Sequence, residues 1–212
     1  MSNATSKYDS DREELALAVP SSAHRVLDVG CDTGRFGALV KKLGSSRRNV
    51  YGVEPSGVES DFLESYEEVW RGVFPEAIPP DLLFDCIAMN DVLEHMDDPW
   101  GALAQAWSLL QPGGVLVGSV PNVRQAKVIF DLVVRGDFTY REVGIMDVGH
   151  LRFFTRSTVQ VALTAAGFSV QSIRGTNIPQ RRWMYRLLNR LWPAASEAFL
   201  ARQIMFIASR DV

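Results

Sequence analysis

Glycines and acidic residues recur at a spacing that could bind a nucleoside. Gly30 and Gly34 lie in the run LDVGCDTG, residues 27–34. Such glycines let the backbone approach a ligand closely, and the helix that follows would offer free N–H groups to an anionic group. Glu54 comes twenty residues after Gly34, where a carboxylate can accept hydrogen bonds from both hydroxyls of a ribose. Together these residues predict a nucleoside-type cofactor.

Histidine is the side chain best suited to take up a proton near neutral pH, and the chain has three of them. His24 precedes the first predicted strand, so we expect it at the surface. His95 follows a predicted strand on the cofactor side, and His150 lies in the half expected to face the substrate. Either one could be a base, with His150 slightly favoured, and a structural role is the alternative for both. Cys31 and Cys86 are expected to be buried thiols, and no metal site is expected.

Strands and helices alternate along most of the chain, which predicts an α/β fold with helices on both faces of a mostly parallel sheet. Ligands of such sheets bind beyond the carboxyl ends of the strands, so the loops there should carry the chemistry. The predicted strands are residues 25–30, 49–54, 67–73, 83–90, 115–120, 168–174 and 203–209. The predicted helices are residues 11–19, 34–43, 56–66, 99–110, 123–135, 155–167 and 181–192.

The glycine-rich loop departs from the dinucleotide fingerprint G-x-G-x-x-G, which would need glycine at Asp32 and Arg35. Its pattern, D-x-G-x-x-x-G, closely resembles the first motif of class I S-adenosylmethionine (SAM)-dependent methyltransferases. The resemblance extends to FDCI at 84–87 and LQPGG at 110–114. The run NDVLEH at 90–95 resembles the branch that includes the ubiquinone-biosynthesis methyltransferases. The runs VPN, GHLRFFT and AGF at 120–122, 149–155 and 166–168 resemble bacterial methyltransferases linked to polysaccharide pathways.

The resemblance implies a doubly wound, Rossmann-like, seven-stranded sheet whose last strand runs antiparallel. It implies SAM as the cofactor, with Glu54 on the ribose and with Asn90 and Asp91 beside the methionine end. The residues it assigns to cofactor binding are Asp28, Gly30, Cys31, Asp32, Gly34, Glu54, Pro55, Asn90 and Asp91. Asp32 stands where the family usually has a second glycine. Aspartate tolerates a left-handed backbone better than most residues, so we expect the turn to survive.

The length of 212 residues predicts a single methyltransferase domain, with a core at 23–120 and 150–212. Residues 121–149 are long for a connection and are predicted to form a lid over the acceptor. Residues 181–192 form a basic amphipathic pattern, which suggests peripheral contact with a membrane or an anionic acceptor. The alternative is a helix that packs into the core or a dimer interface.

Charge is distributed unevenly along the chain. The net charge is −3, but residues 1–100 hold 9 basic and 19 acidic residues, and residues 101–212 hold 13 and 6. This overall balance argues against a nucleic-acid partner, whereas the basic second half suits an anionic small molecule. No apolar stretch is long enough for a membrane span or a signal peptide, so a cytoplasmic location is expected. The oligomeric state is not predicted.

The sequence as a whole predicts SAM-dependent methylation of a small-molecule acceptor, with oxygen as the expected acceptor atom. A saccharide, a quinone or a lipid-linked molecule would suit the resemblance. Two alternatives stay open: a domain of the same fold that binds a nucleoside cofactor without transferring methyl groups, and an NAD-dependent oxidoreductase. Asp32 makes the first alternative conceivable, while Asp32 and Arg35 together argue against the second.

Overall fold

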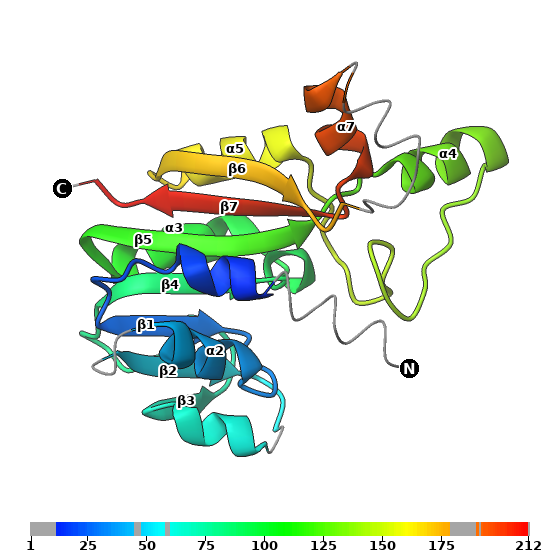
Figure 1. Cartoon of the computed structure of the whole chain (residues 1–212). Helices are drawn as coiled ribbons and strands as arrows, with labels where there is room; N and C mark the ends of the chain where they lie inside the picture. The colour runs from blue at the N-terminus through cyan, green and yellow to red at the C-terminus, as the bar shows by residue number, and fades with distance from the viewer. Residues whose placement is uncertain (1–11, 45–47, 58–59, 179–189, 191, 212) are drawn as a thin grey trace.

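A seven-stranded sheet forms the centre of the protein (Figure 1). The computed structural model describes residues 12–44, 48–57, 60–178, 190 and 192–211. The strands are β1 (Arg25–Val29), β2 (Asn49–Glu54), β3 (Glu68–Arg71), β4 (Phe84–Asn90), β5 (Leu110–Pro121), β6 (Ser169–Thr176) and β7 (Gln203–Ser209). They lie in the order β3-β2-β1-β4-β5-β7-β6. β1 to β5 pair in parallel, and β7 runs antiparallel to both of its neighbours. The predicted seven strands with an antiparallel last strand are thus confirmed.

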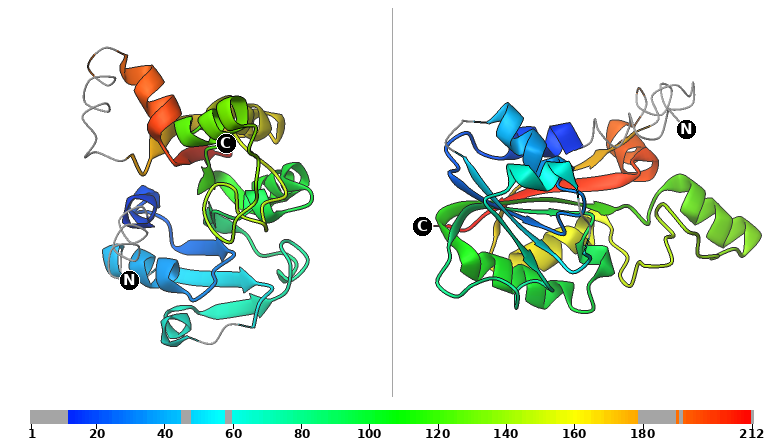
Figure 2. Two further views of the ribbon diagram at one scale, coloured as in Figure 1. Left: turned by 90° about the vertical axis from the view of Figure 1, so that its right-hand side faces the viewer. Right: turned by 90° about the horizontal axis from the view of Figure 1, so that it is seen from below.

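Helices cover both faces of the sheet, as predicted, and each face has its own apolar cluster (Figure 2). The helical residues 12–18 and α2 (Arg35–Leu43) pack on one face, where Val40 is fully buried. α3 (Pro99–Leu109) and α5 (Arg156–Ala165) pack on the other face, where Leu103 and Leu163 are buried. Local sequence fixes where these two helices begin: Asp98 accepts a hydrogen bond from the N–H of Gly101, and Thr155 closes a capping box.

Several predicted elements differ from the structure. The helix predicted for residues 56–66 is a short 3-10 helix, η1 (Asp61–Ser65), which ends where the Tyr66 side chain turns into the core. The predicted strand 115–120 is longer, because the residues around Gly113 still pair with Arg210 beyond the end of β7. The structure also has a helix that was not predicted, α7 (Pro193–Leu200). The helix predicted for residues 181–192 lies almost entirely outside the described residues.

The strand order reverses between β1 and β4, so the loops that follow these two strands diverge and leave a crevice at the carboxyl edge of the sheet. α4 (Ala126–Arg135) lies beyond this same edge, at the right in Figure 1, and the chain returns from it through residues 136–149. α4 and residues 136–149 therefore lie at the edge of the sheet where ligands of parallel sheets bind. Within the described residues, no helix has the length and apolar character needed to cross a membrane.

Candidate functional site

The loop between β1 and α2 is held in an unusual backbone conformation. Gly30, Asp32 and Gly34 have φ angles of 70°, 44° and 80°, all in the left-handed region. Asp32 therefore takes up the conformation expected of it in the sequence, with its side chain exposed, whereas Cys31 is buried as predicted. Gly34 is the N-cap of α2, so the first N–H groups of that helix face the loop. The loop can approach a ligand with main-chain atoms.

Glu54, at the end of β2, joins this loop through its side chain. Its Oε2 atom accepts a hydrogen bond of 3.0 Å from the N–H of Asp32, and its Oε1 atom accepts bonds from the N–H and the hydroxyl of Ser56 at 3.0 and 2.7 Å. An ionised carboxylate offers about four acceptor positions, so one remains on Oε2. The half-buried carboxylate is thus already oriented and can accept one further hydrogen bond. Pro55 lies exposed in the turn that follows.

Asp28 in β1 is almost fully buried beneath the loop, and its Oδ2 accepts a hydrogen bond of 2.5 Å from the hydroxyl of Tyr66. Burial raises the pKa of Asp28 to about 7, while the Tyr66 hydrogen bond and the Arg12 guanidinium act in the opposite direction. Asp28 therefore stands between its charged and neutral forms at neutral pH. Neither Tyr66 nor Arg12 was predicted from the sequence to have a role.

Asn90 ends β4, and Asp91 follows it, on the other side of the crevice. Both polar atoms of the Asn90 amide are buried, and neither has a hydrogen-bond partner within the described part of the chain. Asp91 has a φ angle of 54°, and its carboxylate accepts hydrogen bonds from Ser119 at 2.9 Å and from Gln203 at 2.7 Å. Burial raises the pKa of Asp91, against the effects of Ser119 and Arg12. An unpaired buried amide is costly, so Asn90 is suited to a ligand that would pair with it.

The two candidate bases, His95 and His150, come together although 55 positions separate them. Their rings meet edge to face with centroids 4.8 Å apart. Nδ1 of His95 lies 2.9 Å from the carbonyl oxygen of Gly149, and Nδ1 of His150 lies 2.9 Å from that of Ile145. A carbonyl can only accept, so each Nδ1 carries the hydrogen and each neutral ring keeps its lone pair on Nε2.

The Nε2 atoms of the two histidines have different surroundings. His95 is exposed, whereas His150 is buried and its Nε2 lies 4.0 Å from Oε1 of Glu94. Glu94 is 1% exposed, and neither of its carboxylate oxygens has a hydrogen-bond partner among the described residues. Burial raises the pKa of Glu94 well above its usual range, and the charge of Asp91 adds to the effect. Nε2 of His150 thus faces a buried acid, while Nε2 of His95 is accessible.

Glu94, His95 and His150 also form a group whose ligand atoms lie within 4.8 Å of one another, a spacing at which a metal ion could be held. Glu94 and His95 occur together in the run NDVLEH, but the sequence alone did not bring His150 beside them. The absence of a metal, predicted from the sequence, stays a prediction.

A cavity of about 510 Å³ lies beside this cluster. It begins at Asp91 and extends under α4 and residues 136–149. Its walls combine apolar side chains such as Phe138 and Met146 with both histidines. Three basic and five acidic side chains also line it: Lys127, Arg141 and Arg202, with Asp91, Glu94, Asp131, Asp137 and Asp147. The size suits a small organic molecule.

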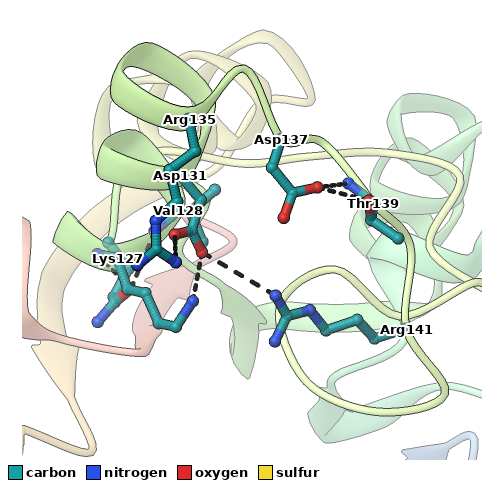
Figure 3. A network of polar contacts seen from close by, with 8 residues as sticks. Lys127, Val128, Asp131, Arg135, Asp137, Thr139 and Arg141 are labelled. Atoms are coloured by element: carbon teal, nitrogen blue, oxygen red, sulfur yellow. Dashed lines mark hydrogen bonds and ion pairs between the residues drawn. The ribbon is translucent and has the colours of Figure 1, made fainter.

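Asp131 organises the outer wall of this cavity (Figure 3). Its buried carboxylate accepts hydrogen bonds from Lys127 and Arg135 on the same helix, and Arg141 of the returning loop reaches to 4.0 Å. These contacts lower the pKa of Asp131. Lys127 and Arg141, two of the three basic side chains that line the cavity, therefore share one carboxylate, which also links α4 to the loop that follows it.

Comparison with known proteins agrees with this arrangement. The family model described as a methyltransferase domain matches residues 2–173. The chain belongs to this methyltransferase family. It is 26% identical over 168 residues to the ubiquinone biosynthesis O-methyltransferase of Ralstonia nicotianae, covering 76% of this chain and 69% of that protein. The corresponding enzyme of Xylella fastidiosa is 28% identical over 184 residues, covering 83% and 73%.

The fold of this methyltransferase has close structural parallels. A SAM-dependent methyltransferase from Archaeoglobus fulgidus superposes with a TM-score of 0.69 at 18% identity, covering 95% of this chain and 93% of that one. The protein is thus a class I, SAM-dependent methyltransferase with a Rossmann-like fold, as the motifs around Gly30 and Gly34 predicted. Membership of this family also replaces the oxidoreductase alternative. Its acceptor is a small molecule.

Proposed function

We propose that this methyltransferase transfers the methyl group of SAM to a hydroxyl oxygen of a small molecule bound in the 510 Å³ cavity. The observation that carries the proposal is the unpaired, buried amide of Asn90 at the end of β4, next to Asp91, which lines that cavity. The curated relatives are named as O-methyltransferases, which supports oxygen as the acceptor atom. The proposed acceptor is a saccharide, a quinone or a lipid-linked molecule.

The residues at the carboxyl edge fit SAM. Glu54 has one acceptor position left for a ribose hydroxyl, and the left-handed loop from Gly30 to Gly34 offers main-chain atoms to the methionine part. Asn90 would pair with the polar atoms of that part, and Arg12, which lies near Asp28 and Asp91, would attract its carboxylate. SAM supplies a methyl group that is already activated on a sulfonium sulfur, so the protein contributes mainly by positioning.

His95 is the better candidate for the base, although the sequence slightly favoured His150. Its Nδ1–H donates to Gly149, which leaves the Nε2 lone pair accessible beside the cavity. In the transfer, the acceptor oxygen would bond to the methyl carbon, the bond from that carbon to sulfur would break, and the hydroxyl proton would pass to His95. His150 would instead hold the loop by donating to Ile145.

The charges around the cavity favour a neutral acceptor over the anionic one considered from the sequence. Three basic side chains line the cavity: Lys127 and Arg141, which both face Asp131, and Arg202. Arg152 and Arg156 do not line it. Burial raises the pKa of Asp91 and Glu94, but Asp131, Asp137 and Asp147 in the same walls still match the three basic side chains in number, so the cavity has no surplus of positive charge to focus on an anion.

Four narrower points remain proposals. The chain would fold as a single domain, with residues 121–149 as the lid, because α4 and its returning loop form the outer wall of the cavity. We also propose a cytoplasmic location. Peripheral contact with a membrane was inferred from residues 181–192, most of which lie outside the described part. The roles of the candidate cofactor-binding and base residues are likewise proposals.

The test is calorimetry followed by an acceptor screen. The full chain should bind S-adenosylhomocysteine and should not bind NAD under the same conditions. It should then release S-adenosylhomocysteine from SAM when offered a panel of phenols, catechols and sugars. Asn90→Leu should lose affinity for the cofactor, whereas Asn49→Leu, at the far end of β2, should not. A chain that binds the cofactor but methylates no member of a broad panel would favour the inactive alternative.

A further inference from the structure

Tyr66 connects three parts of the cofactor half of the protein. It follows η1, its hydroxyl donates to Oδ2 of Asp28 at the end of β1, and the same oxygen accepts a hydrogen bond of 2.9 Å from the N–H of Gly37 in α2. Asp28 and Tyr66 are both buried. The side chain thus lies beneath the glycine-rich loop and satisfies polar groups on both sides of it.

Two glycines make room for this ring. A Cβ atom on Gly37 would lie 2.2 Å from Cζ of Tyr66, and a Cβ on Gly52 would lie 3.1 Å from Cδ1. Gly37 is helical, where glycine costs about 1 kcal/mol relative to alanine, so its presence there has a steric reason. Gly37 and Gly52 therefore leave space for the ring of Tyr66. Phenylalanine would fill the same space and lack only the hydroxyl.

The charged groups around Asp28 leave its ionisation finely balanced. Burial raises the pKa of Asp28 to about 7, and the charges of Glu54 and Asp32 act in the same direction. The Tyr66 hydrogen bond and the Arg12 guanidinium favour the ionised form. Among these groups, Tyr66 acts through a direct hydrogen bond, which depends on its hydroxyl oxygen alone.

We propose that Tyr66 is a positioning residue for cofactor binding, and that it keeps Asp28 ready to lose its proton when SAM binds. This inference rests on the proposed cofactor site. SAM carries a net positive charge, because its sulfonium and ammonium groups outnumber its one carboxylate. An ionised Asp28 beneath the loop would attract that charge, and a protonated Asp28 would not. Binding of SAM and release of the Asp28 proton are then linked.

Because SAM binding and proton release from Asp28 are linked, the direction of the pH effect on SAM affinity follows. Asp28 ionises as the pH rises through its pKa of about 7, so affinity for SAM should increase over the same range. If bound SAM lowers that pKa well below 6, the Kd should be about tenfold larger at pH 6 than at pH 8. About half a proton should be released for each SAM bound at pH 7.

The experiment is calorimetric titration of the full chain with SAM from pH 6 to pH 9, in two buffers of different ionisation enthalpy at each pH. Buffer-dependent heat that reports proton release near pH 7, with weaker binding at pH 6, supports the proposal. A Kd that stays within about twofold from pH 6 to pH 8 overturns it. Failure to bind SAM at any pH would instead overturn the proposed cofactor site.

Variants separate the role of the hydroxyl from a purely structural one. Tyr66→Phe should weaken SAM binding at pH 7 and recover most of its affinity by pH 9, because its Asp28 ionises at higher pH. Asp28→Asn should bind SAM weakly with no pH dependence in this range. Tyr140→Phe, at an exposed tyrosine outside the cavity lining, is the matched control. A Tyr66→Phe loss of equal size at every pH would contradict the proposal, and the titration of the unmutated chain tests it even if this variant fails to fold.

Discussion

Glu54 offers the sharpest test of the cofactor site, because the structure allows its hydrogen bonds to be counted. Three of about four acceptor positions on its carboxylate are filled by Asp32 and Ser56, which leaves one for the proposed hydrogen bond from a ribose hydroxyl. A hydrogen bond to a charged acceptor contributes about 1.5–3 kcal/mol, which corresponds to about 10- to 150-fold in Kd. Glu54→Ala should therefore weaken S-adenosylhomocysteine binding by that factor, towards its upper end, because it also frees the left-handed loop at Asp32.

The assay is calorimetry with S-adenosylhomocysteine, together with thermal unfolding to show that the variant is folded. Ser56→Ala is the matched control: it removes the 2.7 Å hydroxyl contact but leaves the carboxylate in place, so its Kd should change by less than about threefold. Glu54→Gln should fall between the two, because its amide –NH₂ must face one of the N–H donors. An unchanged Kd in a folded Glu54→Ala protein would refute the assignment of Glu54 to the ribose.

Three other expectations concern the loop, the base and the acceptor. Asp32→Val should lower the free energy of unfolding by about 1–3 kcal/mol in urea titrations, and Asp32→Gly should not, because a β-branched residue is strained at a φ of 44°. His95→Ala should lower kcat by about 10²- to 10⁴-fold with cofactor affinity kept, whereas an equal loss only in His150→Ala would reverse their roles. Between about 50 and 300 mM salt, kcat/KM should change by less than about twofold; a steep fall would restore the anionic acceptor.

The cofactor half could be predicted because its signals are local in sequence. Gly30, Gly34 and Glu54 occupy the ends of consecutive strands and loops, and a parallel sheet brings such ends to one edge. The left-handed backbone at Asp32 likewise follows from the residue and the turn around it. Short-range rules failed at residues 56–66, where the packing of Tyr66 against α2 stops the helix after one short segment.

Contacts between distant residues could not be predicted in the same way. Asp28 and Tyr66 are 38 positions apart, and although Asp28 belongs to the glycine-rich motif, nothing in that motif indicates Tyr66 as its partner. His95 meets the loop at Gly149 across 54 positions, and only the return of the chain from α4 brings His150 beside it. Glu94 was visible in the sequence, but its burial, which decides its chemistry, depends on that same return.

Charge shows why the acceptor could not be inferred from composition. The second half of the chain has an excess of basic residues, yet what a ligand experiences is the charge that lines its cavity. There, Lys127 and Arg141 converge on Asp131, a single acid placed within one turn of Lys127 on α4. A paired cation attracts a further anion less strongly than a free one, and here the Asp131 carboxylate of α4 faces Arg141 of the loop that follows the helix. We therefore expect the acceptor to be selected by the shape and the hydrogen-bonding groups of the cavity, whose walls include His95 and apolar side chains such as Phe138 and Met146.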